Sequence, residues 1–322
     1  MPEKGLQVNS HSTQNTVIDA IMHPPRTLVM GVLNITEDSF SDGGRYLDQE
    51  QAFAHAQQMI EDGADIIDIG AESTRPGAIR VPEEVERERI VTAVRRLHDE
   101  FPSIALSVDT TRAVVAQAAL EAGAHIINDV SGGQLDPDIP ALVAEYDCLY
   151  VVQHWRAWLG SGTGASGQND TQADRDTSIY TNGVVEDTLH ELNEQIEAVR
   201  ASGVPAERII CDPGLGFSKP TIEHNLPLIM ATSRFTHLGY PVLIGASRKR
   251  FVGAMNASAG LNIDSESDRD NMTEALTVLA AERGAWAVRV HDVRRNRAAV
   301  EAVALAEKMT YSAGRHAQQR QE

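Results

Sequence analysis

The chain has 322 residues, with 46 acidic and 28 basic side chains and a formal net charge of −18 at pH 7. This acidity excludes a general surface for nucleic acid or an anionic membrane, so any phosphate site must be a local cationic pocket. No apolar stretch is long enough to span a membrane, and residues 1–26 lack the hydrophobic segment of a signal peptide. Cys148 and Cys211 lie in apolar runs without CxxC spacing, which predicts buried free thiols and a reducing cytoplasm.

Eight short apolar runs recur along the chain and have the composition of buried parallel strands. They cover residues 28–33, 66–69, 104–108, 126–127, 149–152, 209–210, 242–244 and 287–290. Helical patterns lie between and after them, at residues 48–62, 82–100, 112–122, 137–146, 184–202, 222–233, 268–283 and 294–308. Eight alternations of strand and helix predict an α/β fold, a single-domain (β/α)₈ TIM barrel. A doubly wound open sheet is the alternative, but no GxGxxG follows the first run.

The barrel is predicted to span residues 27–310, between a flexible N-terminal tail at 1–26 and a flexible C-terminal tail at 311–322. Residues 159–182, rich in Gly, Ser, Thr and Asp, predict a long flexible loop after the fifth run. Residues 256–267 predict a second loop or the frayed end of a short helix. The chemistry is therefore expected at the ends of the strands, where α/β barrels keep their active sites.

The first two connections carry polar residues directly after a strand. The first, NITEDSFSDGGR, resembles a closing lid, and Asn34 at its start could offer its amide oxygen to Mg²⁺; a helix-capping turn is an equally good interpretation. The second, AESTRPGA, places Arg75 beside a rigid Pro-Gly turn, where its guanidinium suits a phosphate or carboxylate. A salt bridge between Arg75 and Glu72 is the commoner reason for such a pair.

Asp109, Asn128 and Asp212 end three different strands, so a barrel would bring them together at its mouth. A carboxylate can accept two N–H bonds from an amidine-like ring edge, while an amide both donates and accepts. Helix capping and paired acids for hydrolysis remain open as alternatives.

Cations and glycines follow the last three strands. The segment DPGLGFSK (212–219) could form one wall of an aromatic pocket, and GASRKRF (245–251) concentrates three cations in an acidic chain. Arg289 and His291 lie two residues apart and face the same way in an extended chain, which predicts an anion clamp. His154 lacks such a neighbour and has an even chance of being structural.

These segments together resemble the dihydropteroate synthase family of folate biosynthesis, the target of sulfonamides. The resemblance runs from Leu28 to Val303 and rests on NITEDSFSDGG, GAESTRPGA, SVDT, NDVSGG, DPGLGF, GASRKRF and RVHDV, in the family's order. The HWRAW stretch is most similar to the actinobacterial branch. Glu37 stands where many relatives have Pro, and the loop at 159–182 is longer than usual.

The resemblance implies a transferase, usually a homodimeric barrel, that joins 6-hydroxymethyl-7,8-dihydropterin pyrophosphate to 4-aminobenzoate and releases pyrophosphate. Its implied pterin residues are Asp109, Asn128, Asp212 and Lys249, of which Asp109, Asp212 and Lys249 are also the candidate catalytic residues. Pyrophosphate and Mg²⁺ are assigned to Asn34, Arg75, Arg289 and His291, with Asn34 as the metal ligand. The aminobenzoate pocket is assigned to Thr74, Pro76, Phe217 and Ser247, and the first mobile loop to Phe40 and Asp42.

The implied reaction is SN1-like, with cations and Mg²⁺ stabilising the departing pyrophosphate and Asp109 the pterin cation left behind. Closed loops would keep water from that cation. One alternative is a pterin-binding methyltransferase barrel, against which the SRKRF and RVHDV segments argue. Another is a catalytically inactive homologue that binds pterin or only dimerises.

Overall fold

The structure is a computed structural model that describes residues 10–35, 45–72, 81–156 and 177–318. Eight parallel strands form its centre: β1 (Leu28–Asn34), β2 (Ile66–Gly70), β3 (Ala105–Asp109), β4 (Ile126–Asp129), β5 (Leu149–Gln153), β6 (Ile209–Asp212), β7 (Leu243–Ile244) and β8 (Ala287–Val290). The strands are ordered β6-β5-β4-β3-β2-β1-β8-β7, and a parallel bridge between Cys211 and Val242 connects the two ends. The predicted single-domain (β/α)₈ barrel is confirmed.

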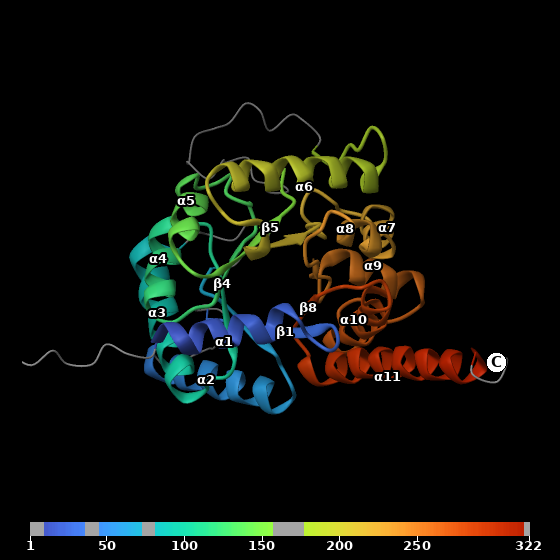
Figure 1. Ribbon diagram of the computed structural model, residues 1–322, viewed down its shortest axis with the longest axis horizontal. Coiled ribbons are helices and arrows are strands. Elements are labelled where there is room, and N and C mark those ends of the chain that lie inside the picture. Colours follow the sequence, from blue (N-terminus) through green and yellow to red (C-terminus); the bar gives the residue numbers. More distant parts are fainter. Residues whose placement is uncertain (1–9, 36–44, 73–80, 157–176, 319–322) are drawn as a thin grey trace, which may run out of the picture.

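Helices surround the strands as an outer ring (Figure 1). They are α2 (Arg45–Glu61), α3 (Glu83–Glu100), α4 (Ala113–Glu121), α5 (Asp138–Glu145), α6 (Val184–Ala201), α7 (Ile222–Met230), α8 (Thr232–Thr236), α9 (Arg250–Ser258), α10 (Glu266–Ala281) and α11 (Val293–Gln318), with a short 3₁₀ turn at Ala206–Arg208. Helix α10 begins two residues before the predicted start, since the Ser265 side chain accepts a hydrogen bond from the Asp268 amide and caps it. None of the helices among the described residues is long and apolar enough to cross a membrane.

The alternation of side chains along each strand produces two separate cores. Outward-facing residues such as Ile67 and Val108 pack against the helices, while inward-facing residues fill the barrel. The inner core contains Leu28, Met30, Ile66, Ala105, Ile126, Leu149, Val151, Ile210, Leu243 and Ala287. Because this apolar filling occupies the barrel interior, polar inward-facing residues can meet only beyond it, at the carboxyl ends of the strands.

The N-terminal segment differs from its prediction. Residues 1–26 were expected to be a flexible tail, yet Ser10–Met22 form helix α1, and its Val17 and Ile21 are buried in the inner core. The indole nitrogen of Trp286 donates to the Ile21 carbonyl oxygen at 2.7 Å. Arg26 then forms a two-point contact with Asp65, at 2.8 and 2.9 Å. The helix therefore covers the amino-terminal end of the barrel, opposite the strand ends.

The C-terminal helix extends beyond residue 310, where the barrel was predicted to end. A flexible tail was expected at residues 311–322, but helix α11 continues from Val293 to Gln318. Figure 1 shows its last part extending away from the barrel. The buried Val300 and Val303 anchor the first half of this helix on the outer core.

Candidate active site

The strand register places three of the predicted residues side by side. Asn34 pairs with Gly70, Gly70 with Asp109, and Asp109 with Asn128, in one row across four neighbouring strands. Asn128 and Asp212 each follow an inward-facing isoleucine by two positions, so their side chains face into the barrel mouth. A Cβ atom at Gly70 would lie 3.7 Å from the Asn34 amide oxygen and 3.6 Å from the Asp109 Cβ. The glycine thus leaves open space between two predicted ligand-binding side chains.

Arg289 joins two carboxylates at the mouth. Its Nε donates to Asp68 at 2.6 Å, and one terminal nitrogen donates to Asp109 at 2.8 Å. Asp68 is fully buried and also accepts from the Ser107 hydroxyl at 2.6 Å and from the Asn128 amide at 3.2 Å. These contacts with Asp68 hold the side chains of Asn128 and Arg289 from the interior side of the mouth.

Burial at this cluster changes the acidity of its members. The pKa of Asp109 rises to about 7 because burial penalises its carboxylate, while Arg289 opposes the rise. Burial alone would lower the pKa of Arg289, but the charges of Asp68 and Asp109 outweigh it, and the pKa is raised. The guanidinium therefore stays charged, and Asp109 can exchange a proton near neutral pH.

A second cluster lies across the mouth, around Asp212 and Lys249. A Cβ atom at Gly245 would lie 3.8 Å from the Lys249 amine, 3.8 Å from the Arg289 Cβ and 3.9 Å from an Asp212 carboxylate oxygen. The Lys249 amine donates to the Leu215 carbonyl oxygen and lies 4.7 Å from the centre of the Phe217 ring.

The charges in this second cluster support each other. Burial lowers the pKa of Lys249 to about 8, and Asp212 opposes this shift. Burial raises the pKa of Asp212, against the opposing charge of Lys249 and a hydrogen bond from the Gly214 amide at 2.7 Å. An ionised Asp212 beside a charged Lys249 can accept hydrogen bonds from a ligand N–H edge while the amine binds a neighbouring acceptor atom.

The loops after β7 and β8 meet through Ser247 and His291. The Ser247 hydroxyl and the His291 Nδ1 are 2.9 Å apart, and the His291 amide donates to the same hydroxyl at 3.2 Å. Arg248 turns the other way and binds Asp270 at 2.8 and 2.9 Å. Of the three cations in GASRKRF, Lys249 is therefore the one directed into the cluster, whereas Arg248 fastens this loop to α10.

Some predicted site residues lie outside the described residues: Thr74, Arg75, Pro76, Phe40 and Asp42. The two ends of the segment 73–80 are nonetheless defined. Glu72 accepts from the Val81 amide at 3.0 Å and from Arg112 at 3.2 Å, and Arg112 donates to the Val81 carbonyl oxygen at 3.0 Å. Buried Glu86 binds the same guanidinium and accepts from the Thr110 hydroxyl at 2.6 Å. This network fixes the base of the segment that carries three predicted residues.

The donor set fits Mg²⁺ only together with a ligand. Within the described ranges, His, Cys, Asp and Glu form no group of three or more that could hold a metal ion. Asn34 is exposed at the end of β1 and offers one amide oxygen. Mg²⁺ often takes one or two protein oxygens and completes its shell with phosphate and water, so a pyrophosphate beside Asn34 would supply the missing ligands.

Sequence reasoning missed two residues in this region. Asp68 lies inside the apolar run Ile66–Ile69 and was read as part of a strand; a charged residue in a fully buried run was the available signal. Lys219 was noted only as one cation of the DPGLGFSK segment, but it is fully buried and contacts His154 at 2.8 Å. His154 is accordingly a bonded structural residue rather than an isolated histidine.

The fold and the site together define a barrel enzyme whose mouth presents acid, amide and cation groups suited to an N–H-rich ring and an anion. The chain matches the family model described as pterin binding enzyme over residues 30–291. It is 44% identical over 275 residues to the dihydropteroate synthase of Mycobacterium leprae, covering 85% of this chain and 92% of that protein. The chain therefore belongs to the pterin-binding enzymes and, among them, to the dihydropteroate synthase family.

Solved structures agree with this assignment. The Xanthomonas albilineans dihydropteroate synthase with 4-aminobenzoic acid has a TM-score of 0.75 and 35% identity, covering 88% of this chain and 93% of that one. The same enzyme in complex with 7,8-dihydropteroate has a TM-score of 0.71 and 30% identity, with 88% and 93% covered. The predicted family is confirmed by sequence and by structure.

Proposed function

We propose that this protein condenses 6-hydroxymethyl-7,8-dihydropterin pyrophosphate with 4-aminobenzoate to give 7,8-dihydropteroate and pyrophosphate, as a dihydropteroate synthase. The observation that carries this proposal is the convergence of Asp109, Asn128, Asp212 and Lys249 on one barrel mouth, next to Arg289 and His291. Such a mouth can bind a pterin edge and a pyrophosphate at the same time.

The pterin is assigned to the deeper part of the mouth. Asp212 accepts from its amino and ring N–H groups, while Lys249 donates to a neighbouring acceptor. Asn128, held by its bond to Asp68, both donates and accepts at the ring. The polar edge of the pterin thereby exchanges its hydrogen bonds to water for hydrogen bonds to these fixed side chains. This orients the reacting carbon toward the opening of the barrel.

The 4-aminobenzoate is assigned to the wall beyond Lys249. Phe217 supplies an aromatic ring with the Lys249 amine 4.7 Å from its centre, Ser247 provides a hydroxyl, and the carbon stem of Lys249 is expected to line the same wall. Thr74 and Pro76 are expected to complete this pocket. The amine of the aminobenzoate would then face the pterin carbon that loses pyrophosphate.

Pyrophosphate is assigned to Arg289 and His291, together with Arg75 and an Mg²⁺ ion held by Asn34. When bound there, Mg²⁺ supplies charge neutralisation for the departing pyrophosphate. To bind pyrophosphate, Arg289 would transfer its hydrogen bond from Asp109 to a phosphate oxygen. This exchange leaves the Asp109 carboxylate without its cation, next to the carbon where positive charge develops.

The reaction follows from these placements. The bond between the pterin methylene carbon and the pyrophosphate oxygen breaks, and cationic side chains stabilise the leaving group. The Asp109 carboxylate stabilises the resulting pterin cation, and the aminobenzoate nitrogen attacks it and loses a proton. The loops with Phe40 and Asp42 and with Arg75 would exclude water until the new C–N bond has formed.

The deciding experiment mixes the purified protein with the pterin pyrophosphate, 4-aminobenzoate and Mg²⁺, and measures pyrophosphate and dihydropteroate. Pyrophosphate release coupled to dihydropteroate formation supports the synthase. Tight pterin binding without product would favour the inactive homologue. In a separate assay with a methylated pterin and a corrinoid, methyl transfer would favour the methyltransferase.

We further propose a homodimer in the cytoplasm, as usual for the family. The two free cysteines, both buried, fit a reducing compartment. Light scattering on the purified protein should give twice the mass of one chain, and a monomer mass at micromolar concentration would contradict the dimer.

A further inference from the structure

A buried lysine outside the assigned pocket shapes the segment that forms the pocket wall. Lys219 is fully buried, and its amine lies 2.8 Å from the Nδ1 of His154 and 3.1 Å from the carbonyl oxygens of both Gly214 and Phe217. Three acceptors match the three N–H donors of an ammonium group. Lys219 thus closes the segment 213–219 on itself and ties it to the end of β5.

The contact with Lys219 defines the state of His154. A protonated Lys219 can only donate, so in that state Nδ1 accepts and the ring proton is on Nε2, which donates to Glu191 at 2.9 Å. Burial, followed by the charge of Lys219, lowers the pKa of His154 to about 4, so the ring is neutral. Burial would raise the pKa of Glu191, but bonds from His154 and Arg156 outweigh it and hold it at about 2.

In the triad Lys219–His154–Glu191, the ring of His154 therefore links a buried amine on one side to a carboxylate on the other. Burial lowers the pKa of Lys219, and the charge of Asp212 opposes this. The charges of Lys249 and Arg156 also lower this pKa, whereas Glu191 and the three hydrogen-bond acceptors favour the protonated amine. In return, the Lys219 charge favours the ionised form of Asp212, which the proposed pterin site requires.

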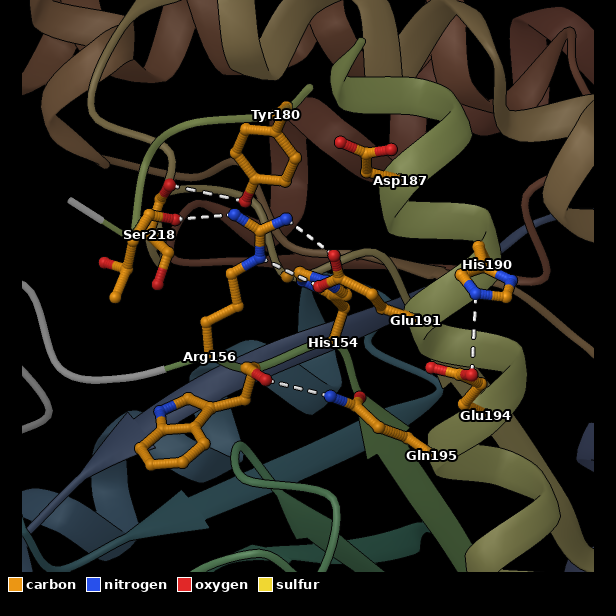
Figure 2. Close-up of polar contacts among 12 residues, drawn as sticks. His154, Arg156, Tyr180, Asp187, His190, Glu191, Glu194, Gln195 and Ser218 are labelled. Atoms are coloured by element: carbon orange, nitrogen blue, oxygen red, sulfur yellow. Dashed lines mark hydrogen bonds and ion pairs between the residues drawn. The ribbon is translucent and has the colours of Figure 1, made fainter. Parts of the chain in front are cut away.

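The carboxylate of Glu191, which lies on α6, is held by Arg156 as well as by His154. Arg156 donates to both Glu191 oxygens, at 2.8 and 2.6 Å, and its guanidinium lies 3.9 Å from the centre of the Tyr180 ring. The Tyr180 hydroxyl donates to the Ser218 carbonyl oxygen at 3.3 Å. Figure 2 shows these side chains converging between α6 and the segment that contains Ser218.

The segment 213–219 needs such support because its backbone is strained. Ser218 is buried and has a φ of 53°, a backbone conformation that residues other than glycine rarely adopt. A Cβ atom at Gly214 would collide with the His154 carbonyl oxygen, so the backbone of 213–219 passes too close to His154 for any residue but glycine at this position. The same segment presents the Leu215 carbonyl oxygen to Lys249 and the Phe217 ring beside it.

We propose that Lys219, His154 and Glu191 form a positioning triad that holds residues 213–219 in the shape required by the 4-aminobenzoate pocket. This inference rests on the proposed function. The triad touches no reacting atom; it acts through Phe217 and through the carbonyl oxygen that orients Lys249. Its loss should therefore weaken aminobenzoate binding more than it slows the bond-breaking step.

The test compares Lys219→Met and Glu191→Gln with two matched controls. The controls are Lys308→Met, an exposed lysine on α11, and Glu194→Gln, an exposed carboxylate on α6 paired with His190 at 3.4 Å. Steady-state kinetics are measured with 4-aminobenzoate as the varied substrate, and pterin pyrophosphate affinity by calorimetry. In Lys219→Met we expect the KM for aminobenzoate to rise about tenfold, with kcat and the pterin Kd changed less than about threefold.

Glu191→Gln should also raise the KM for aminobenzoate, but by a smaller factor than Lys219→Met. Since both residues act in one triad, adding Glu191→Gln to Lys219→Met should raise the KM by less than Glu191→Gln does alone. A purely structural role would instead lower Tm and the active fraction while the KM stays at the wild-type value. That result in either variant overturns the proposal. If Lys219→Met does not fold, Glu191→Gln decides, because it keeps the shape and most hydrogen bonds of the triad.

The two proposals fail in different ways. If the wild-type protein forms no dihydropteroate, the proposed function is wrong. Calorimetric titration of 4-aminobenzoate into wild type and variants then decides the positioning role independently. An unchanged aminobenzoate affinity in Lys219→Met, in a protein whose wild type is active, overturns the triad alone.

Discussion

Arg289 donates to Asp109 at 2.8 Å across the barrel mouth, so the cation assigned to the leaving group and the carboxylate assigned to the pterin cation are partners before substrate arrives. Each neutralises the other in the free protein, which limits the cost of holding two charges in a largely buried site. Pyrophosphate binding would separate them and expose both charges to the reacting atoms. In the free protein, the ion pair therefore already places the positive and the negative charge that the bond-breaking step is proposed to need.

The pH dependence of kcat/KM should be bell-shaped. The pKa of Asp109 is raised to about 7, so its carboxylate becomes protonated below that pH, and the pKa of Lys249 is lowered to about 8, so its amine loses charge above it. Since kcat/KM reports groups of the free enzyme, activity should fall on both sides of a maximum between pH 7 and 8. A profile that stays flat from pH 5 to pH 7 would contradict the ionised role of Asp109.

Lys249→Ala should abolish turnover and leave the fold intact. The substitution removes the amine that contacts the Leu215 carbonyl oxygen and faces Phe217, so we expect kcat/KM to fall roughly 100-fold or more. Circular dichroism and Tm should match the wild type, with Lys308→Ala as the control for loss of a lysine. Near-normal activity would refute the role given to Lys249.

Asp68→Asn should destabilise the barrel and disturb the site. Asp68 is fully buried and accepts from Ser107, Asn128 and Arg289, so removing its charge leaves Arg289 with Asp109 as its remaining partner in the cluster. We expect the free energy of unfolding to drop by about 3 kcal/mol and the pterin affinity to fall. Urea unfolding measures the first and calorimetry the second. Ser107→Ala, which removes one neutral donor, should cost much less.

Acid should destabilise the protein through His125. Burial, with His98 nearby, lowers the pKa of His125 to about 4 from an ordinary 6.5, so the unfolded chain takes up a proton that the folded chain does not. Stability is therefore complete above pH 6.5 and is lost as the pH falls toward 4, by about 3 kcal/mol from this group. In His125→Asn the Tm should fall less steeply between pH 7.5 and 4.5. His23→Asn, at an exposed position, should behave like the wild type; an equal slope in His125→Asn would refute the assignment.

Activity should require Mg²⁺, and Asn34 should determine the Mg²⁺ concentration that is needed. Removal of the ion by EDTA should stop pyrophosphate release, and added Mg²⁺ should restore it. In Asn34→Ala the Mg²⁺ concentration for half-maximal activity should rise by about tenfold, because the substitution removes the amide oxygen proposed to bind the ion. Its Tm should be unchanged. Full activity of the wild type in EDTA would contradict the metal assignment.

The sequence predicted the eight strands because each is a short, mainly apolar run, and it predicted Asp109, Asn128 and Asp212 because each lies at the carboxyl end of such a run. Asp68 was missed because neighbouring isoleucines dominate the run that contains it. The pairing of His154 with Lys219 could not be predicted, since the two residues are 65 positions apart and only the fold brings them together.

The N-terminal helix was missed for a different reason. Its composition is mostly polar, but Val17 and Ile21, and likewise Ile18 and Met22, are spaced four apart and form a short apolar stripe. Such a short stripe is a weak signal alone, and its partner Trp286 lies 265 residues away. Tertiary packing, rather than local preference, explains this helix.

The bond between Trp286 and Ile21 also determines when the molecule can finish folding. Strand β1 pairs with β2 on one side, but its other neighbour is β8, and Ile21 of the first helix accepts a hydrogen bond from Trp286, just before β8. During synthesis, one edge of β1 therefore stays unpaired until β8, more than 250 residues later, has been made. For that period the inner core around Val17 and Leu28 lacks the side chains of Trp286 and Ala287, so barrel closure is a late step in folding.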